Sequence, residues 1–223
     1  MNHSNRYKWA TLALSLSSAM AAHAGRPLGV DDASVNDKGA GHVEVWVARD
    51  SAKNTLINLA PAYAPIDDLE LSAVLSRDTT NRLNTQTLQA KWRITPAQEK
   101  GCNVAGVLGA TRLPAGAGST AYLTGNLSCN ALGPFNVHAN LGVSKAKDVA
   151  STGTWGLAVE LPLTGWTPHA EVFGVERSKP TVQFGARTQL TKELQLEGTV
   201  GRNNAQTVAS IGMKYQFQSE LDG

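Results

Sequence analysis

Ionisable side chains recur at alternating positions through most of this 223-residue chain, a spacing that would place them on one face of successive β-strands. The residues that we expect to share one environment are Glu44, Lys91, Arg93, His138, Glu160, Arg187, Glu197 and Lys214. An arginine or lysine that faced lipid at mid-depth would cost about 2–4 kcal/mol, so in a membrane-spanning sheet these side chains must face the interior. There they would line a lumen and could contact a permeating solute.

Two interpretations of this interior are compatible with the sequence. In the first, the lumen is a narrow, water-filled channel in which Lys91, Arg93 and Arg187 form a cationic lining. The carboxylates that would oppose them are Glu44, Glu160 and Glu197. In the second, basic and acidic side chains pair with one another and fill a closed lumen, which would give a structural barrel without transport.

Enzymatic chemistry is the rival class, since a lipid hydrolase in a barrel would place a serine beside a histidine on the outer wall. Beyond the first 24 residues the histidines are His42, His138 and His169. Ser144 lies six residues after His138, too far along one strand for a hydrogen bond, so a second strand would have to supply the nucleophile. We find no G-x-S-x-G motif, no histidines at metal-ligand spacing and no phosphate-binding loop. The sequence therefore predicts no catalytic residue, no metal site and no cofactor.

The elements that would position the charged residues are strands of about ten residues separated by short polar turns. Residues 181–217 show the pattern most clearly, because three such segments follow one another there. The strands that we expect lie at 41–49, 54–63, 68–76, 84–94, 102–112, 119–129, 134–144, 153–162, 167–176, 180–190, 193–202 and 206–217. The fold class predicted is all-β, a transmembrane antiparallel up-and-down β-barrel of about twelve strands. Its second and fourth strands are the least regular, because Pro61 interrupts one and residues 84–89 are mostly polar in the other.

Other folds fit the sequence less well. After the N-terminal apolar run, no stretch reaches the roughly 18 apolar residues of a membrane-spanning helix. A soluble β-sandwich also alternates, but here polar and apolar faces persist from end to end with no helix to cover either, which favours the barrel. Without Arg6 and Lys8 the chain would hold 18 basic and 18 acidic residues, so its charge does not suggest a nucleic-acid binder.

The chain divides into four parts. Residues 1–24 read as a secretory signal: Arg6 and Lys8 precede an apolar run that ends at Ala22-His23-Ala24, a small-x-small cleavage site. Residues 25–40 are not strand-like, and we expect them either to stay in the periplasm or to fold into the lumen, where Asp31 and Asp32 would meet basic wall residues. Residues 41–217 form the barrel and 218–223 a short tail. With an even strand number, both chain ends would lie in the periplasm of a bacterial outer membrane.

The two cysteines test the strand register. If residues 102–112 and 119–129 form a hairpin in which Leu108 pairs with Leu123, then Cys102 lies directly opposite Cys129. An even cysteine count in an exported chain favours a disulfide, and metal or redox sites would need a C-x-x-C spacing or nearby histidines. We therefore predict a Cys102–Cys129 disulfide.

Several short motifs stand out in the N-terminal region and the C-terminal third: Arg26-Pro27-Leu28, Asp31-Asp32-Ala33, Gly39, Glu171-Val172-Phe173-Gly174, Phe184-Gly185-Ala186-Arg187, Leu190-Thr191, Leu194-Gln195-Leu196, Val200-Gly201-Arg202 and Gly212-Met213-Lys214-Tyr215-Gln216-Phe217. Together they resemble the outer-membrane transporter family associated with the MetA pathway of phenol degradation. The resemblance implies an outer-membrane β-barrel, inserted into lipid by the barrel-assembly machinery, that moves an unspecified small-molecule solute. It supplies no catalytic residues. Barrels of this kind usually end on the terminal aromatic, whereas here Gln218 to Gly223 follow Phe217.

Overall fold

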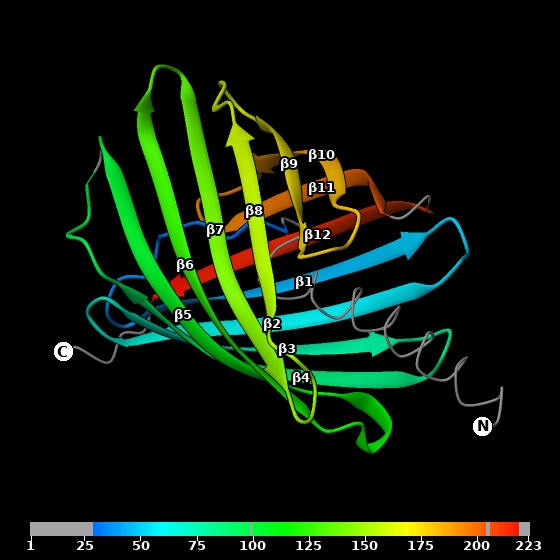
Figure 1. Cartoon of the computed structure of the whole chain (residues 1–223). Coiled ribbons are helices and arrows are strands. Elements are labelled where there is room, and N and C mark those ends of the chain that lie inside the picture. Colours follow the sequence, from blue (N-terminus) through cyan, green and yellow to red (C-terminus); the bar gives the residue numbers. More distant parts are fainter. Residues whose placement is uncertain (1–28, 99, 204–205, 219–223) are drawn as a thin grey trace, which may run out of the picture.

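The computed structural model describes residues 29–98, 100–203 and 206–218 and shows a closed antiparallel β-barrel (Figure 1). Its strands are β1 (Ala40–Asp50), β2 (Thr55–Ile66), β3 (Leu69–Asp78), β4 (Leu83–Arg93), β5 (Cys102–Arg112), β6 (Ser119–Leu132), β7 (Phe135–Ala146), β8 (Thr152–Glu160), β9 (Thr167–Val175), β10 (Thr181–Gln189), β11 (Leu194–Asn203) and β12 (Gln206–Gln218). A single 3₁₀ turn, η1 (Pro114–Gly116), lies between β5 and β6 in the described part of the chain. The predicted fold class and strand number are confirmed.

Each strand pairs with its neighbours in sequence, and β1 pairs with β12 to close the sheet. The predicted strand boundaries lie within a few residues of those observed. The eighth strand ends at Glu160 instead of residue 162, and Gln218, predicted to begin the tail, is the last residue of β12. The predicted signal at residues 1–24 and the remaining tail residues lie outside the described part of the chain.

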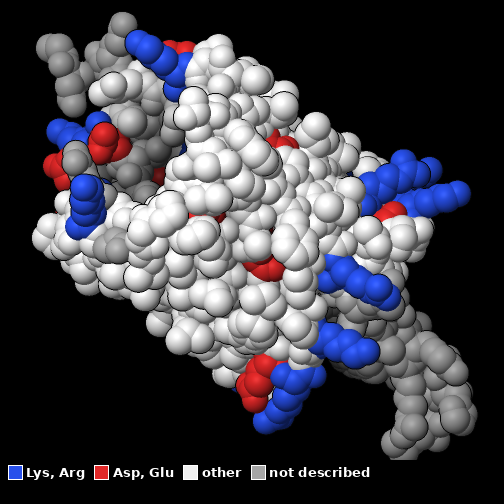
Figure 2. Space-filling view, turned by 90° about the horizontal axis from the view of Figure 1, so that it is seen from above, with Lys and Arg blue, Asp and Glu red and all other residues white. Residues whose placement is uncertain are grey.

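The two faces of the barrel are chemically inverted relative to a soluble protein. Phe184 of β10 points outward and is 60% exposed, whereas its neighbour Gln183 points inward and is buried. The same alternation runs round the barrel: large apolar side chains cover the outside, and most buried side chains are polar or charged. On the face that Figure 2 shows, Lys and Arg gather at the two ends, and the band between them is mostly uncharged with a few acidic atoms visible in it. No helix among the described residues is long and apolar enough to cross a membrane.

The two least regular strands form for identifiable reasons. On one side of β2, Pro61 pairs with Val43 of β1. On the other side, the register pairs with β3 pass from Leu59 directly to Ala62. Pro61, which has no N–H to donate, therefore lies where the β2–β3 ladder is interrupted. In β4, the polar stretch hides the alternation because the outward residues Asn84 and Gln86 are polar, like the threonines of the inward face. Thr87 there bonds to Thr111 of β5 at 2.8 Å.

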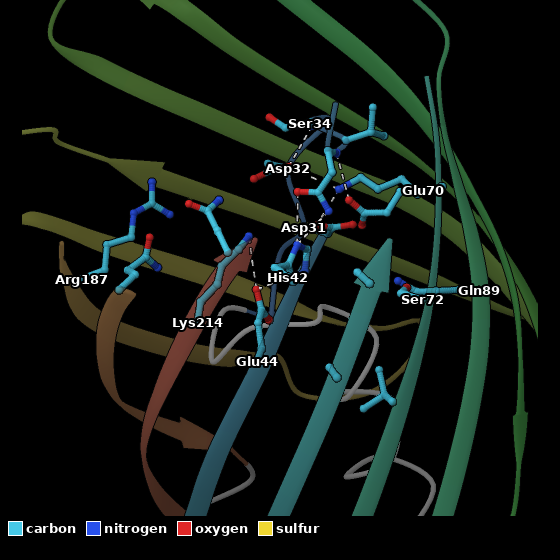
Figure 3. Close-up of a pocket in the computed structure, with 18 residues that line it drawn as sticks. Asp31, Asp32, Ser34, His42, Glu44, Glu70, Ser72, Gln89, Arg187 and Lys214 are labelled. Atoms are coloured by element: carbon cyan, nitrogen blue, oxygen red, sulfur yellow. Dashed lines mark hydrogen bonds and ion pairs between the residues drawn. The ribbon is translucent and has the colours of Figure 1, made fainter. Parts of the chain in front are cut away.

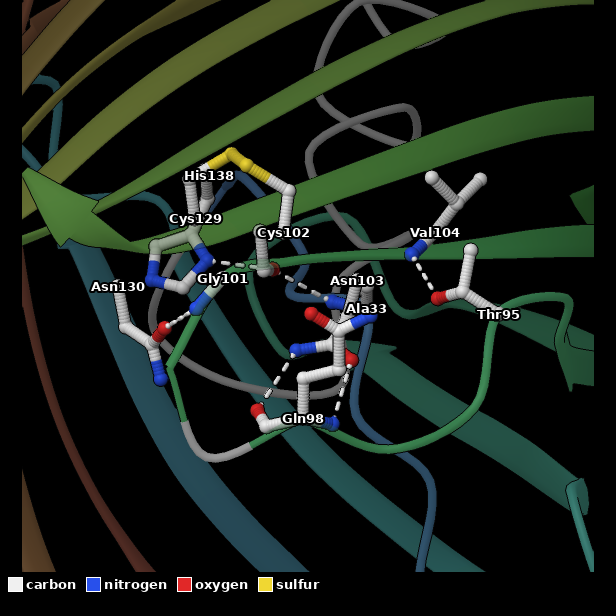
Figure 4. Close-up of a disulfide and its surroundings, with 11 residues drawn as sticks. Ala33, Thr95, Gln98, Gly101, Cys102, Asn103, Val104, Cys129, Asn130 and His138 are labelled. Atoms are coloured by element: carbon white, nitrogen blue, oxygen red, sulfur yellow. Dashed lines mark hydrogen bonds between the residues drawn. A yellow bond between two sulfur atoms is a disulfide. The ribbon is translucent and has the colours of Figure 1, made fainter.

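The predicted disulfide is confirmed. Cys102 of β5 and Cys129 of β6 are register partners and are joined at the end of this hairpin (Figure 4). The backbone holds the same end independently, since the Gly101 N–H donates to Asn130 Oδ1 at 2.7 Å and the Asn130 N–H donates to the Gly101 carbonyl at 3.0 Å. The disulfide therefore reinforces a hairpin that is already paired.

Replacing both cysteines by alanine should lower the free energy of unfolding by about 2 kcal/mol, near the lower end of the usual range, without preventing barrel formation. The effect is limited because eleven register pairs join β5 to β6. Denaturant unfolding of the refolded protein in lipid vesicles measures it. Reductant should destabilise the wild type and leave the double variant unchanged, whereas a double variant that cannot form a barrel would contradict this account.

Candidate functional site: a charged lumen crossed by a strap

The inner wall carries ion pairs that join neighbouring strands. At the seam where the barrel closes, Glu44 of β1 is the register partner of Lys214 of β12, and Lys214 Nζ lies 3.5 Å from Glu44 Oε1. His42 Nε2 lies 3.7 Å from the same carboxylate oxygen. All three side chains are buried, so each charge depends on nearby groups of opposite sign or on hydrogen bonds.

A second group of charges extends from β6 to β10. The Arg187 guanidinium donates to Glu160 Oε2 at 2.6 Å, and His138 Nε2 lies 3.5 Å from the same oxygen. The other ring nitrogen of His138 is 2.7 Å from the Ser128 hydroxyl. A third contact, between His169 Nε2 and Glu197 Oε1, spans 3.6 Å.

Residues 29–39, which we call the strap, precede β1, and the first part of the strap lies inside the barrel. Its apolar residues Val30 and Ala33 are buried, and the Val30 N–H donates to Glu171 Oε2 of β9 at 2.8 Å. Gly156 of β8 makes room for this approach, since a Cβ there would lie 2.8 Å from Val30 Cγ2. The first described residues of the chain are therefore fitted against the inner wall.

Asp31 is held by two asparagines that are themselves register partners, Asn126 of β6 and Asn140 of β7. The Asp31 N–H donates to Asn140 Oδ1 at 2.8 Å, and Asn140 Nδ2 donates back to the Asp31 carbonyl at 2.8 Å. Asn126 Nδ2 donates to the Asp31 carboxylate at 3.0 Å and to the Asp32 carbonyl at 3.2 Å. Four hydrogen bonds thus fix two consecutive strap residues.

Lys91 of β4 contacts the carboxylates of two strap residues, Asp31 and Asp32. Its Nζ donates to Asp31 Oδ1 at 3.0 Å and to Asp32 Oδ1 at 3.3 Å, and its side chain is only 5% exposed. Removing one partner of a buried pair commonly costs about 3–5 kcal/mol, because the other charge loses its compensation. Lys91 therefore ties the strap to a second part of the wall, three strands away from Asn140 on β7.

The strap then leaves the lumen beside β1. The Asn36 N–H donates to Glu70 Oε2 of β3 at 3.1 Å, and Asn36 Nδ2 lies 3.0 Å from His42 Nδ1. The Gly39 N–H donates to the Ala64 carbonyl of β2 at 2.9 Å, directly before β1 begins. Strap and wall thus contact each other along most of the strap's length.

The strap leaves part of the lumen open as a cavity of about 310 Å³. Figure 3 shows charged side chains from the wall and from the strap around it. The charged or titratable residues of its lining are Asp31, Asp32, His42, Glu44, Glu70, Lys91, Arg187 and Lys214. Such a cavity can hold water and a small polar molecule between groups of both signs.

Of the eight side chains expected to line a lumen, Glu44, Lys91, Arg187 and Lys214 line the cavity. Three others, His138, Glu160 and Glu197, take part in the wall contacts described above. Arg93 instead lies at the end of β4, where it pairs with Asp68 of the β2–β3 turn at 2.5 Å. Lys91 also differs from the expected arrangement, since the carboxylates it binds come from the strap.

Two uncharged residues that bind the strap are not among those that the sequence singles out. Asn126 and Ser128 occupy inward positions of β6, and the alternation of that strand places them there. Their partners could not be read from the sequence, because the strap belongs to a segment for which two placements were open. Ser128 of β6 also contacts His138 of β7. Residue spacing along the strand of His138 could not reveal a partner on the neighbouring strand.

The fold and its interior define a porin-like β-barrel: a closed sheet of twelve strands, apolar outside and charged inside. The chain belongs to the family described as "Uncharacterised conserved protein UCP029691", whose model matches residues 11–212. No curated protein matches the sequence.

Solved outer-membrane barrels have a similar fold. The KdgM porin in complex with disordered oligogalacturonate has a TM-score of 0.69 and 11% identity, over 79% of this chain and 99% of that one. The NanC porin has a TM-score of 0.63 and 10% identity, over 78% and 98%. The COG4313 outer membrane channel from Pseudomonas putida F1 has a TM-score of 0.59 and 13% identity, over 83% and 98%. At these identities the likeness establishes the fold, and the link to phenol degradation stays a prediction.

The Ser128→Ala variant should loosen the strap at one position. The Ala33 N–H donates to Ser128 Oγ at 2.8 Å, and loss of one such bond, worth about 1 kcal/mol, should speed amide exchange at Ala33 about fivefold. Hydrogen–deuterium exchange measures this. Ser210→Ala is the matched control, because Ser210 bonds to Thr199 on the wall. Equal exchange at Ala33 in both variants would contradict the placement of the strap.

Proposed function

We propose that the protein is a bacterial outer-membrane channel for small solutes, with a narrow, charged lumen that the strap constricts. The observation that carries this proposal is the cavity of about 310 Å³ between strap and wall, lined by side chains of both charges. The polar and charged side chains around this cavity would provide a hydrated surface for a permeating solute.

The outer face of the barrel supports an outer-membrane location. Large apolar side chains on all sides, with charge gathered at the two ends, suit a surface surrounded by lipid hydrocarbon. A cleaved signal at residues 1–24 would deliver the chain to the periplasm, from which the barrel-assembly machinery would insert it into outer-membrane lipid. Both chain ends would face the periplasm, and the turns that follow odd-numbered strands would face outward.

A plugged barrel without transport is the second candidate, and the strap favours it. Four strap N–H groups, those of Val30, Asp31, Ala33 and Asn36, donate to wall side chains, and Lys91 binds two strap carboxylates. If the strap never moves, the open space beside it has to carry any flux. The two candidates therefore differ in whether the cavity connects both ends of the barrel.

A hydrolase is less well supported, although Ser128, His138 and Glu160 lie in contact. The Ser128 hydroxyl accepts the Ala33 N–H, and none of the three lines the cavity where a substrate could sit. Glu160 is also bound by Arg187. This group suits a positioning role in the wall, and we propose no catalytic function.

Single-channel recording in planar bilayers tests the channel. The Arg187→Gln/Lys214→Gln variant removes two positive charges from the cavity lining, so it should shift ion selectivity toward cations. Lys145→Gln/Lys192→Gln removes the same charge from exposed positions outside the lumen and should leave selectivity near that of the wild type.

Folding of each variant is checked by the heat-dependent gel mobility typical of barrels. Discrete conductance steps with the expected shift support the channel. Wild-type protein that is folded and inserted but silent would reject it in favour of the plugged barrel. An equal shift in both variants would mean that the lumen charges do not contact the permeating ions.

A further inference from the structure

The wall binds the strap through features that many peptides share. Asn140 bonds to both the N–H and the carbonyl of Asp31, Ser128 accepts the Ala33 N–H, and Glu171 accepts the Val30 N–H. These are main-chain contacts, so they do not depend on the identity of the strap side chains.

Successive contacts are two residues apart both along the strap and along β6. Asn126 and Asn140 are register partners, and two residues further along β6 the next inward pair is Ser128 and His138. The strap advances in the same step, from Asp31 at the first pair to Ala33 at the second. The inward face of β6 and β7 thus presents polar side chains at the two-residue period of a peptide chain.

The wall also contacts the strap side chains, and these contacts depend on side-chain charge and size. Lys91 binds the carboxylates of both Asp31 and Asp32, and Asn126 donates to that of Asp31. Val30 lies against Gly156, and Ala33 is fully buried, so the flanking positions accept small apolar side chains. In the strap, the wall therefore contacts two adjacent carboxylates that lie between two apolar residues.

We propose that the inner wall formed by β4, β6, β7 and β9 is a binding site for acidic peptides, and that strap residues 30–33 occupy it as a built-in competitor. The assignment of such peptides as the transported solute rests on the proposed channel, whereas binding requires only that a peptide can enter the lumen. It names the solute class: short peptides with adjacent carboxylates, held by main-chain bonds and Lys91.

The test uses full-length protein in detergent with residues 30–33 replaced by Gly-Ser-Gly-Ser, and fluorescently labelled peptides read by anisotropy. One peptide copies Gly29 to Asn36, a second has an unrelated sequence with Asp-Asp between small residues, and a third carries Asn-Asn in place of Asp-Asp. Both aspartate peptides should bind the replaced-strap protein. They should bind the wild type at least about tenfold more weakly, because its own strap competes. The asparagine peptide should bind at least about tenfold more weakly than the aspartate peptides.

Wall variants in the replaced-strap background locate the site. Lys91→Met and Asn140→Ala should each weaken binding about tenfold, and Ser210→Ala should not change it. A folded replaced-strap protein that binds neither aspartate peptide would overturn the proposal. Binding of the strap sequence alone would also overturn it, since the strap would then be a dedicated plug.

The peptide-binding test and the conductance experiment can fail separately. A protein that conducts ions but binds no acidic peptide rejects this inference and leaves the channel standing. A protein that binds both aspartate peptides but never conducts keeps the binding site and rejects the channel.

Discussion

Closure of the sheet is the constraint on which the rest of the structure depends. A strand edge exposed to hydrocarbon would leave its N–H and carbonyl groups without partners, at a cost of several kcal/mol each. Register pairs between β1 and β12, from Ala40↔Gln218 to Asp50↔Val208, remove that edge. Closure also separates the two faces of every strand. One face meets the surroundings of the barrel and the other an enclosed lumen, so the side-chain pattern is apolar outside and polar inside.

An enclosed polar lumen creates a second requirement, because buried charges need partners. The wall meets it by cross-strand pairs such as Lys214 with Glu44 and Arg187 with Glu160. The strap contributes in the same way, since it brings two carboxylates to Lys91. The strap, which is not part of the sheet, thus supplies the carboxylates that pair with a buried lysine of the wall. It does so where it narrows the lumen.

A chain of contacts links the strap to the cavity. It runs from the Ala33 N–H to Ser128, from Ser128 to His138, and from His138 through Glu160 to Arg187, which lines the cavity. The strap and the Arg187 guanidinium are therefore joined by one series of polar contacts. Ser128, His138 and Glu160, whose residue types resemble hydrolytic machinery, are members of that series.

The sequence by itself determined the strand number, the inward and outward faces and the Cys102–Cys129 pairing, because a period of two and short turns leave one register for neighbouring strands. It also placed Lys91 and Arg187 on inward faces, but it assigned Arg93 to the lining, whereas that side chain pairs with Asp68 at the strand end. Only the tertiary structure decided which groups meet across the lumen. The strap has no periodic pattern, and its partners Lys91, Asn126 and Asn140 lie on strands far apart in sequence. Such contacts arise when the barrel closes, since closure brings strands from the whole chain around one small interior.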